Sequence, residues 1–346
     1  MTRFKGVSLV VILAIYLVLI PLVFRHSQYV LHVFIMCSQL SIVSLTVRVV
    51  FTVGELSFGQ VVFVMAGAYA SAIFSTKMGL PFWFSLPLAG LTSAIFAALI
   101  GRPILRLRGT YFSILTVILT EVARQGIRSW KYLGGPQGFH GIPRPESIRL
   151  GRFVLVPQFD VVDRLPYYYL IALLLIMTLL TLRRLDRSPT GAAFRATRQN
   201  PSVAESLGIN VTRHRIFALT ISAFFAGLVG SFWAHYLTDF YPESFTLWNS
   251  IDYVLYAFIG GIEFLWGPIV GSFALTWLWE YLGPSAQYRM VLFAVLVIVV
   301  ILFFPGGIVS LVKSLPSPRG VLRKVLPRRA ADLHKKRRER VRDESP

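Results

Sequence analysis

The sequence predicts an all-α fold, a polytopic transmembrane bundle of about ten helical spans (eight to ten), with re-entrant segments among the shorter ones. Three observations lead to this class. Of the 346 residues, 55% are hydrophobic and 15% are charged, and the mean hydropathy is +0.64, so the chain is more apolar than an ordinary soluble domain. The apolar residues also gather in blocks of membrane-spanning length, and basic residues concentrate in particular loops between these blocks.

The blocks are taken in chain order. Residues 7–24 follow Arg3 and Lys5 as in a signal peptide, but the block ends in "PLVFRHSQ" without a small-residue cleavage site, which predicts a retained span. The further blocks of span length are 29–53, 58–78, 82–100, 167–182, 216–237 and 291–304. Three shorter or glycine-interrupted blocks, at 111–123, 251–259 and 268–282, are expected to be short spans or re-entrant segments.

The loop charges predict the topology. Loop 183–215 carries seven arginines against two acids, and loop 101–109 carries three arginines and no acid. Loop 238–250 has two acids and no lysine or arginine. Basic loops stay in the cytoplasm. Ten crossings of a bacterial-type plasma (inner) membrane, with both termini in the cytoplasm, put each of these loops on its expected side. Loop 124–165 is basic yet external, which its length permits.

The net charge of +19 does not indicate nucleic-acid binding, because much of it lies in these loops and in the tail. Residues 1–310 are predicted to form the transmembrane domain, with a cytoplasmic loop at 183–215. Residues 311–346, which contain "HKKRRERVR", are predicted to form a disordered cytoplasmic tail that faces anionic membrane lipids.

The chain lacks the residue patterns that catalysis or metal binding requires. It has no G-x-x-x-x-G-K-[ST] loop for nucleotide phosphates and no H-E-x-x-H motif, and Cys37 is its single cysteine. Ionisable residues expected within the hydrocarbon are few, mainly Arg48, Glu55, Glu121 and Glu280. We therefore expect a transport subunit that binds no cofactor itself and is energised by another subunit, with no catalytic or metal site.

A polar stretch, "ATRQNPSVAESLGINVTRHR" (196–215), separates two apolar blocks. Ser188-Pro189 and Asn200-Pro201 each pair a good helix cap with a proline at the first helical position. The second predicted helix covers 201–207 and stops at Gly208, with Val203, Ala204 and Leu207 on one face. So short a helix is unstable alone, so it docks either on this chain's own spans or on a cytoplasmic partner.

This stretch resembles the cytoplasmic coupling loop of ABC-importer permeases, in the branch that includes the branched-chain amino acid permeases. Five further stretches resemble the same branch, in the same order: "GELSFGQVVFVMAGAYASA", "LRLRGTYFSILTVILTEVAR", "GGPQGFHGIPRP", "SFTLWNSIDYVLYAFIGGIEFLWGPIVGS" and "FFPGGI". Together the six cover roughly residues 40–309 and are most similar to the second, M-type, of the two paired permeases.

The resemblance implies a homologous second permease, two cytoplasmic ATPases and an external solute-binding protein as partners. It implies ATPase coupling through Arg198, Asn200, Pro201, Ala204, Glu205 and Gly208. It also makes the Gly/Pro-rich loop at 134–145 a landing surface for the binding protein, with Gly135, Gln137, Gly138 and His140 as the docking residues.

The motif "GELSFGQ" suggests a translocation path. Glycine-broken backbone is tolerated at a membrane face where it lines a cavity, so Glu55, Ser57 and Gln60 are expected to face the path, unless they form only a tight turn. Arg48 and Glu55 depart from the family pattern. Because they lie seven residues apart, two helical turns, we expect them to share a face and compensate each other's charge.

Alternative functions remain at this stage. The leading one is import of branched-chain or other hydrophobic amino acids, or related small amides. A sugar or nucleoside permease of the same superfamily is the second, and a secondary carrier or an intramembrane enzyme is less well supported. The resemblance implies that the external binding protein largely sets the substrate.

Overall fold

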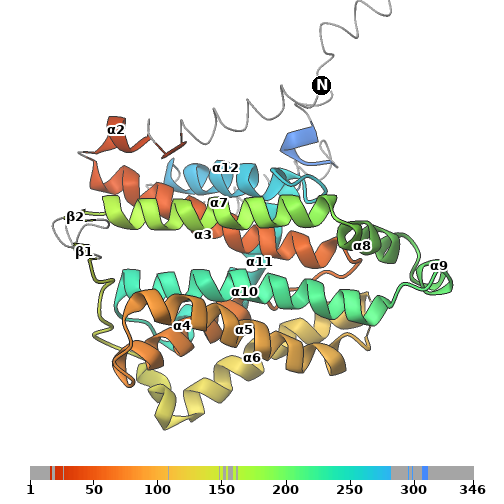
Figure 1. Cartoon of the computed structure of the whole chain (residues 1–346), viewed down its shortest axis with the longest axis horizontal. Helices are drawn as coiled ribbons and strands as arrows, with labels where there is room; N and C mark the ends of the chain where they lie inside the picture. Colours follow the sequence, from red (N-terminus) through yellow and green to blue (C-terminus); the bar gives the residue numbers. More distant parts are fainter. Residues whose placement is uncertain are drawn as a thin grey trace, which may run out of the picture.

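The computed structural model describes residues 16–17, 20–25, 27–107, 109–147, 149–150, 153–154, 159–160, 163–281, 295, 298 and 306–310. Long helices run side by side through most of it (Figure 1): α3 (Gln28–Phe51), α4 (Gln60–Thr76), α5 (Phe82–Ile104), α6 (Thr110–Ser129), α7 (Leu165–Arg187) and α10 (Val211–Leu237). The predicted all-α fold is confirmed. Within the described residues, the one sheet is the two-stranded antiparallel hairpin of β1 (Arg149–Leu150) and β2 (Phe153–Val154).

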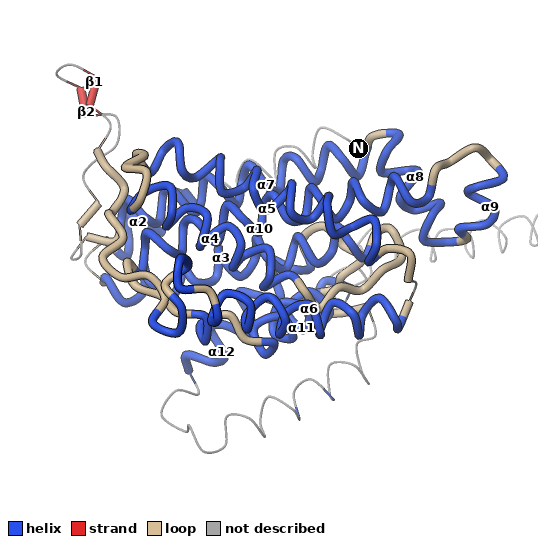
Figure 2. The backbone as a smooth tube through the Cα atoms, turned by 90° about the horizontal axis from the view of Figure 1, so that it is seen from below, coloured by secondary structure: helices blue, strands red, loops and turns tan. Residues whose placement is uncertain are grey.

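The remaining elements are short. They are α2 (Ile20–Phe24), α8 (Pro189–Gln199), α9 (Pro201–Ser206), α11 (Leu247–Gly260), α12 (Gly267–Tyr281) and the 3-10 turns η2 (Lys131–Leu133), η3 (Gly135–Gln137) and η4 (Pro242–Ser244). Figures 1 and 2 place α8 and α9 at one end of the bundle and the β1–β2 hairpin at the other.

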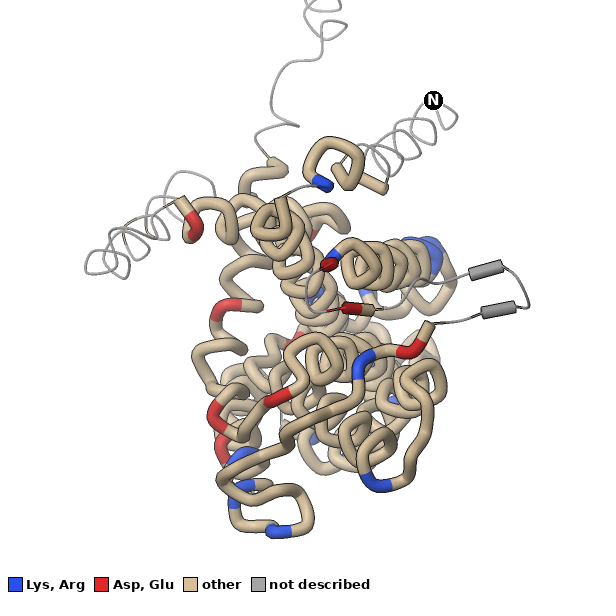
Figure 3. The backbone as a smooth tube through the Cα atoms, turned by 90° about the vertical axis from the view of Figure 1, so that its left-hand side faces the viewer, with Lys and Arg blue, Asp and Glu red and all other residues tan. Residues whose placement is uncertain are grey.

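Four described helices are long and apolar enough to cross a membrane: α3, α5, α7 and α10. Helix α4 is apolar but shorter, at 17 residues. Figure 3, seen along the bundle from the hairpin end, shows isolated charges on otherwise uncharged helices. Most of the expected spans at 7–24 and 291–304 lies outside the described residues, so the count of ten stays a prediction.

Several helices differ in length from the predicted blocks. Helix α7 continues to Arg187 and α10 already begins at Val211, so the polar connection between them is 188–210. The expected short block at 111–123 belongs to the 20-residue helix α6. Hydropathy underestimated these ends because a helix continues into polar residues as long as its backbone stays hydrogen-bonded and its cap lies farther out.

The bundle core depends on small residues between α4, α5 and α10. A Cβ atom at Gly67 would overlap the carbonyl oxygen of Gly227, and one at Gly230 would overlap the carbonyl oxygen of Val64. Ser93 on α5 donates a hydrogen bond to the carbonyl oxygen of Phe63 over 2.9 Å. These backbones approach as closely as they do because the contacting residues are small.

The loops group at the two ends of the bundle. The backbone amide of Gly109 contacts Glu55 and Gly54 abuts Arg198, so the two arginine-rich connections meet at the α8–α9 end. Phe139 pairs with Phe240 at the opposite end, which joins the 134–145 loop to the acidic 238–250 loop. This grouping is the one predicted, with the basic 124–165 loop at the same end as the acidic loop, and which end faces the cytoplasm stays a prediction.

Candidate functional site

The connection at the α8–α9 end is built from two capped helices, as predicted. Ser188 caps α8 through an Oγ atom that accepts a hydrogen bond from the Gly191 amide over 3.2 Å. Asn200 caps α9, and its Oδ1 accepts from the amides of Ser202 and Val203 over 3.1 and 3.2 Å. The chain leaves α9 at Gly208 with a φ of +81°, a left-handed conformation that favours glycine.

The apolar residues of α9 do not all face outward. Val203 and Leu207 are 53% and 75% exposed, whereas Ala204 is 1% exposed and is enclosed by this chain. The predicted single cluster of Val203, Ala204 and Leu207 is therefore wrong. Successive helix positions are about 100° apart, so Ala204 is turned inward while the other two, four positions apart, share the outer face.

Arg198 anchors α8 to the bundle. Its Nη2 lies 3.0 Å from Oε1 of Glu263, in the turn between α11 and α12. Its guanidinium carbon also lies 4.1 Å from the ring centre of Phe51, the last residue of α3. A Cβ on Gly54 would lie 3.2 Å from the Arg198 Cα, so the backbone there is closely packed too. Arg198 thus joins three segments of its own chain.

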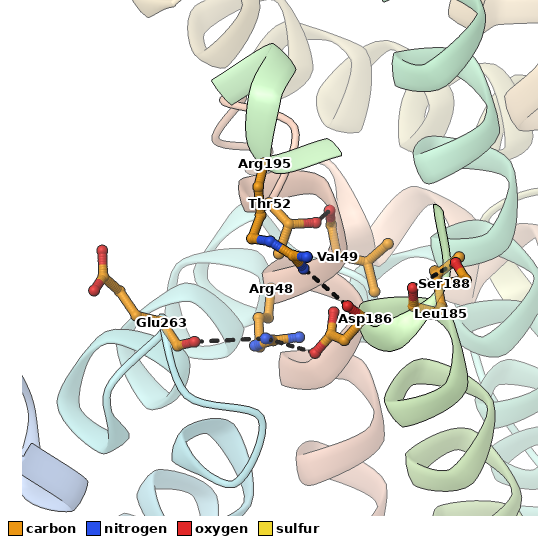
Figure 4. A network of polar contacts seen from close by, with 8 residues as sticks. All are labelled: Arg48, Val49, Thr52, Leu185, Asp186, Ser188, Arg195 and Glu263. Carbon is orange, nitrogen blue, oxygen red and sulfur yellow. Dashed lines mark hydrogen bonds and ion pairs between the residues drawn. The ribbon is translucent and has the colours of Figure 1, made fainter. Parts of the chain in front are cut away.

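A second connection lies beside it (Figure 4). The Nη2 of Arg48 is 2.9 Å from Oδ2 of Asp186 on α7, and 3.5 Å from the backbone oxygen of Glu263. Arg195 on α8 donates to the backbone oxygen of Asp186 over 2.8 Å. Arg48 is only 6% exposed, so this ion pair is largely desolvated on the arginine side.

The expected Arg48–Glu55 pairing is therefore wrong. Helix α3 ends at Phe51, and the chain turns through Gly54 at a φ of +91°, so Glu55 is not on the helical face of Arg48. Glu55 instead pairs with Arg215 near the start of α10, with Oε1 to Nη2 at 3.1 Å. Its Oε2 accepts from the Gly109 amide over 3.1 Å.

The other two residues of the "GELSFGQ" segment are completely buried. Gln60 Oε1 accepts hydrogen bonds from Ser222 over 3.1 Å and from Thr46 over 3.4 Å. Ser57 Oγ accepts from the Gly59 amide over 3.2 Å. These contacts hold the broken segment against α3 and α10. A place for Arg48, Glu55, Ser57 and Gln60 on the translocation path stays a prediction.

The opposite end holds the loop proposed for binding-protein docking. Gln137 and His140 are exposed there, while Gly135 and Gly138 are buried. Oδ1 of Asp239 accepts from the Gly141 amide over 3.0 Å and lies 3.2 Å from the His140 Nδ1. The amide donation, with smaller contributions from Thr238 and His140, lowers the pKa of Asp239. A role in docking stays a prediction.

Sequence reasoning missed Asp186, Arg215 and Glu263 as partners. Each lies at the edge of an apolar block and was counted only as part of the charge of a loop. A lone acid among arginines at the end of a span, such as Asp186, could have indicated an ion pair. Within the described part of the chain, no group of three or more His, Cys, Asp or Glu side chains is placed to hold a metal ion.

The comparison with protein families agrees with this architecture. Residues 29–302 match the family model described as the permease component of the branched-chain amino acid transport system. The chain belongs to this family.

Two relatives are the high-affinity branched-chain amino acid transport system permease proteins LivM of Salmonella typhimurium, 34% identical, and of Escherichia coli, 32% identical. Each alignment covers 275 residues, 75% of this chain and 65% of the relative, so the chain spans about two thirds of their length. A probable permease protein LivH of Methanocaldococcus jannaschii is 26% identical over 133 residues, 36% of this chain and 42% of that protein. No solved structure gives a significant match.

Proposed function

We propose that this chain is the membrane-spanning permease subunit of an ATP-binding-cassette importer for branched-chain or other hydrophobic amino acids, or related small amides. Its partners are a homologous second permease, two cytoplasmic ATPases and an external solute-binding protein. The family membership supports this assignment. The names of the two LivM relatives, which are branched-chain amino acid permeases, support the substrate class.

The observation that carries the proposal is the α8–α9 unit at one end of the bundle. Its helices are capped by Ser188 and Asn200, so they keep their shape although they are short. The outward face of α9 presents Val203 and Leu207, two apolar side chains that are more than half exposed. An exposed apolar pair on a helix with a fixed shape is suited to bind in a groove of a partner. We assign that groove to the ATPase.

The ion pairs behind α8 supply a route for force from the ATPase. Arg198 ties α8 to Glu263 in the α11–α12 turn, and Arg195 ties it to the Asp186 backbone, beside Arg48. A displacement of α8 therefore acts on α3, α7 and the α11–α12 turn together. In this assignment Arg198 acts as an internal link rather than at the edge of the ATPase interface.

The experiment reconstitutes the full importer in proteoliposomes and measures leucine uptake together with substrate-stimulated ATP hydrolysis. Val203→Asp combined with Leu207→Asp removes the apolar face, and we expect ATPase association and stimulated hydrolysis to be lost. Ser202→Asp is the matched control, because it adds a charge to the same helix without removing an apolar contact.

Retention of stimulated hydrolysis in the double variant would show that α9 is not the coupling element. Uptake driven by an ion gradient without the ATPases would indicate a secondary carrier. Uptake of ribose in preference to leucine would indicate the sugar branch. Each result contradicts a different part of the proposal.

The proposed orientation puts the α8–α9 end in the cytoplasm of a bacterial-type inner membrane. Single cysteines at Ser202 and Gln137, both exposed, test it in a Cys37→Ala background. An impermeant thiol reagent added outside intact cells is expected to label the cysteine at position 137 alone. Labelling at 202 alone would reverse the orientation.

A further inference from the structure

An open groove of about 1460 Å³ lies at the α8–α9 end, between the C-terminal part of α5 and the N-terminal part of α10. Its lining includes Arg102 and Arg106 from α5 and the segment after it, and Arg213 from α10. Leu99 and Phe217 line its apolar part. The coupling face of α9, Val203 and Leu207, is not part of the lining.

The groove is strongly basic. Three arginines and His214 contribute to its lining, and no acidic residue does. Within the described part of the chain, the guanidinium groups of Arg102, Arg106 and Arg213 form no ion pair, unlike Arg48, Arg198 and Arg215 nearby. Arginines that line one groove without a carboxylate partner attract an anion, and a phosphate accepts several of their N–H groups at once.

The groove is also continuous with an apolar surface. On α5 the exposed side chains fall at intervals of three or four residues and so form one stripe: Phe84, Leu88, Leu91, Ile95 and Leu99. The next step on the same face is Arg102, and Arg106 lies in the turn just after α5; both are exposed. On α10 the exposed Phe217 follows Arg213 by four residues and repeats the arrangement.

The length of this stripe is close to the full thickness of the bilayer hydrocarbon. From Phe84 to Arg102 the helix rises roughly 27 Å, at about 1.5 Å per residue. That is close to the ~30 Å thickness of bilayer hydrocarbon, so Arg102 falls at the level of the headgroups when the stripe faces lipid. The ligand that fits has a negative head at the arginines and apolar chains along Leu99 and Phe217.

We propose that this groove binds an anionic phospholipid of the leaflet at the α8–α9 end. Its phosphodiester contacts Arg102, Arg106 and Arg213, and its acyl chains lie against Leu99 and Phe217. A soluble phosphate would use the arginines but not the apolar wall, and an acidic protein surface would not use the stripe along α5. A phospholipid uses both.

The test titrates the purified full-length protein in mild detergent with dioleoyl phosphatidylglycerol or dioleoyl phosphatidylcholine and counts bound lipids by native mass spectrometry. The wild type is expected to prefer the phosphatidylglycerol. Arg102→Gln with Arg213→Gln should weaken phosphatidylglycerol binding about thirtyfold, since each basic residue near a lipid surface contributes about fivefold. Phosphatidylcholine binding should not change.

The matched control is Arg184→Gln with Arg187→Gln, which removes the same charge from exposed positions outside the groove. A loss as large in this control would overturn the proposal, because the effect would then come from net charge. Leu99→Ser should also weaken phosphatidylglycerol binding. Displacement of the lipid by millimolar inorganic phosphate, or loss of ATPase association with lipid binding unchanged in the groove variant, would assign the groove to a soluble anion or to a protein instead.

Discussion

The buried Glu55–Arg215 pair gives the sharpest test of how the α8–α9 end is held together. Glu55→Gln keeps the side-chain volume and still accepts from the Gly109 amide, but it removes the charge that faces Arg215. Arg215→Met removes the other charge and keeps an apolar stem of similar length. The two side chains are 1% and 5% exposed, so water does not replace the lost partner.

The magnitude follows from this geometry. At 3.1 Å and an effective dielectric constant of about 20, two unit charges attract by about 5 kcal/mol. Removing one partner of such a buried pair costs about 3–5 kcal/mol, because the surviving charge is left desolvated. Removing both charges should cost less than either single change, so the coupling free energy should be about 2 kcal/mol or more.

The measurement is the free energy of unfolding of the purified chain in mixed detergent micelles, followed by tryptophan fluorescence, for the two single variants and the double variant. Arg48→Met combined with Glu55→Gln provides the control cycle. Arg48 contacts Asp186 and Glu263 instead of Glu55, so that cycle should be additive within about 0.5 kcal/mol. The exposed Glu121–Arg124 pair, one helical step apart, should couple by only about 0.5 kcal/mol.

Additive costs in the Glu55–Arg215 cycle would refute this reasoning, since the pair would then be solvated or separated. A large coupling between Arg48 and Glu55 would refute it as well, because it would require the two side chains to share a partner.

Three further predictions concern single positions. Gly67→Ala should lower the melting temperature by the equivalent of about 1–3 kcal/mol, because the new methyl group overlaps the Gly227 carbonyl, whereas Gly126→Ala, with open space around it, should be neutral or stabilising. Equal melting temperatures would contradict this. Gly208→Ala should destabilise the end of α9 by about 1 kcal/mol through backbone strain alone, since no atom lies near its Cβ, and hydrogen exchange of the α9 amides measures it. The lowered pKa of Asp239 means that its contact with Gly141 contributes stability above pH ~4, and that this stability is lost as the pH falls through the lowered pKa. Hydrogen exchange of the Gly141 amide, corrected for its intrinsic rate, should speed up over that pH range. Asp239→Asn should abolish this pH dependence.

Local signals in the sequence predicted local structure well. Ser188-Pro189, Asn200-Pro201 and Gly208 fixed the starts of α8 and α9 and the end of α9 because a cap acts within about four residues. The apolar blocks that form α3, α4, α5, α6, α7, α10, α11 and α12 could be predicted because hydropathy is also a local property of the sequence. Glu121 and Arg124, three residues apart on α6, form the ion pair that such local spacing favours, with Nη2 to Oε1 at 2.6 Å.

The ion-pair partners could not be predicted in this way. Arg48 and Asp186 lie 138 residues apart in the chain, and their meeting depends on how α3 packs against α7. The expected Arg48–Glu55 pair assumed that the helix continues, but the chain turns at Gly54, and that turn is stabilised by contact with Arg198 on α8. Likewise, the inward direction of Ala204 depends on which face of α9 the bundle covers.

The glycine contacts between α4, α5 and α10 have a consequence for how such a bundle changes shape. Where a carbonyl oxygen lies directly against a Cα, no layer of side chains remains that could change rotamer and let one helix slide along the other. We therefore expect these three helices to move as one rigid unit, held together by the close contacts at Gly67, Gly227 and Gly230. Adjustment during a movement then falls to contacts made through long, solvent-reachable side chains, which can change rotamer while the contact is kept. Arg198 to Glu263 is such a contact, with the two side chains 35% and 66% exposed.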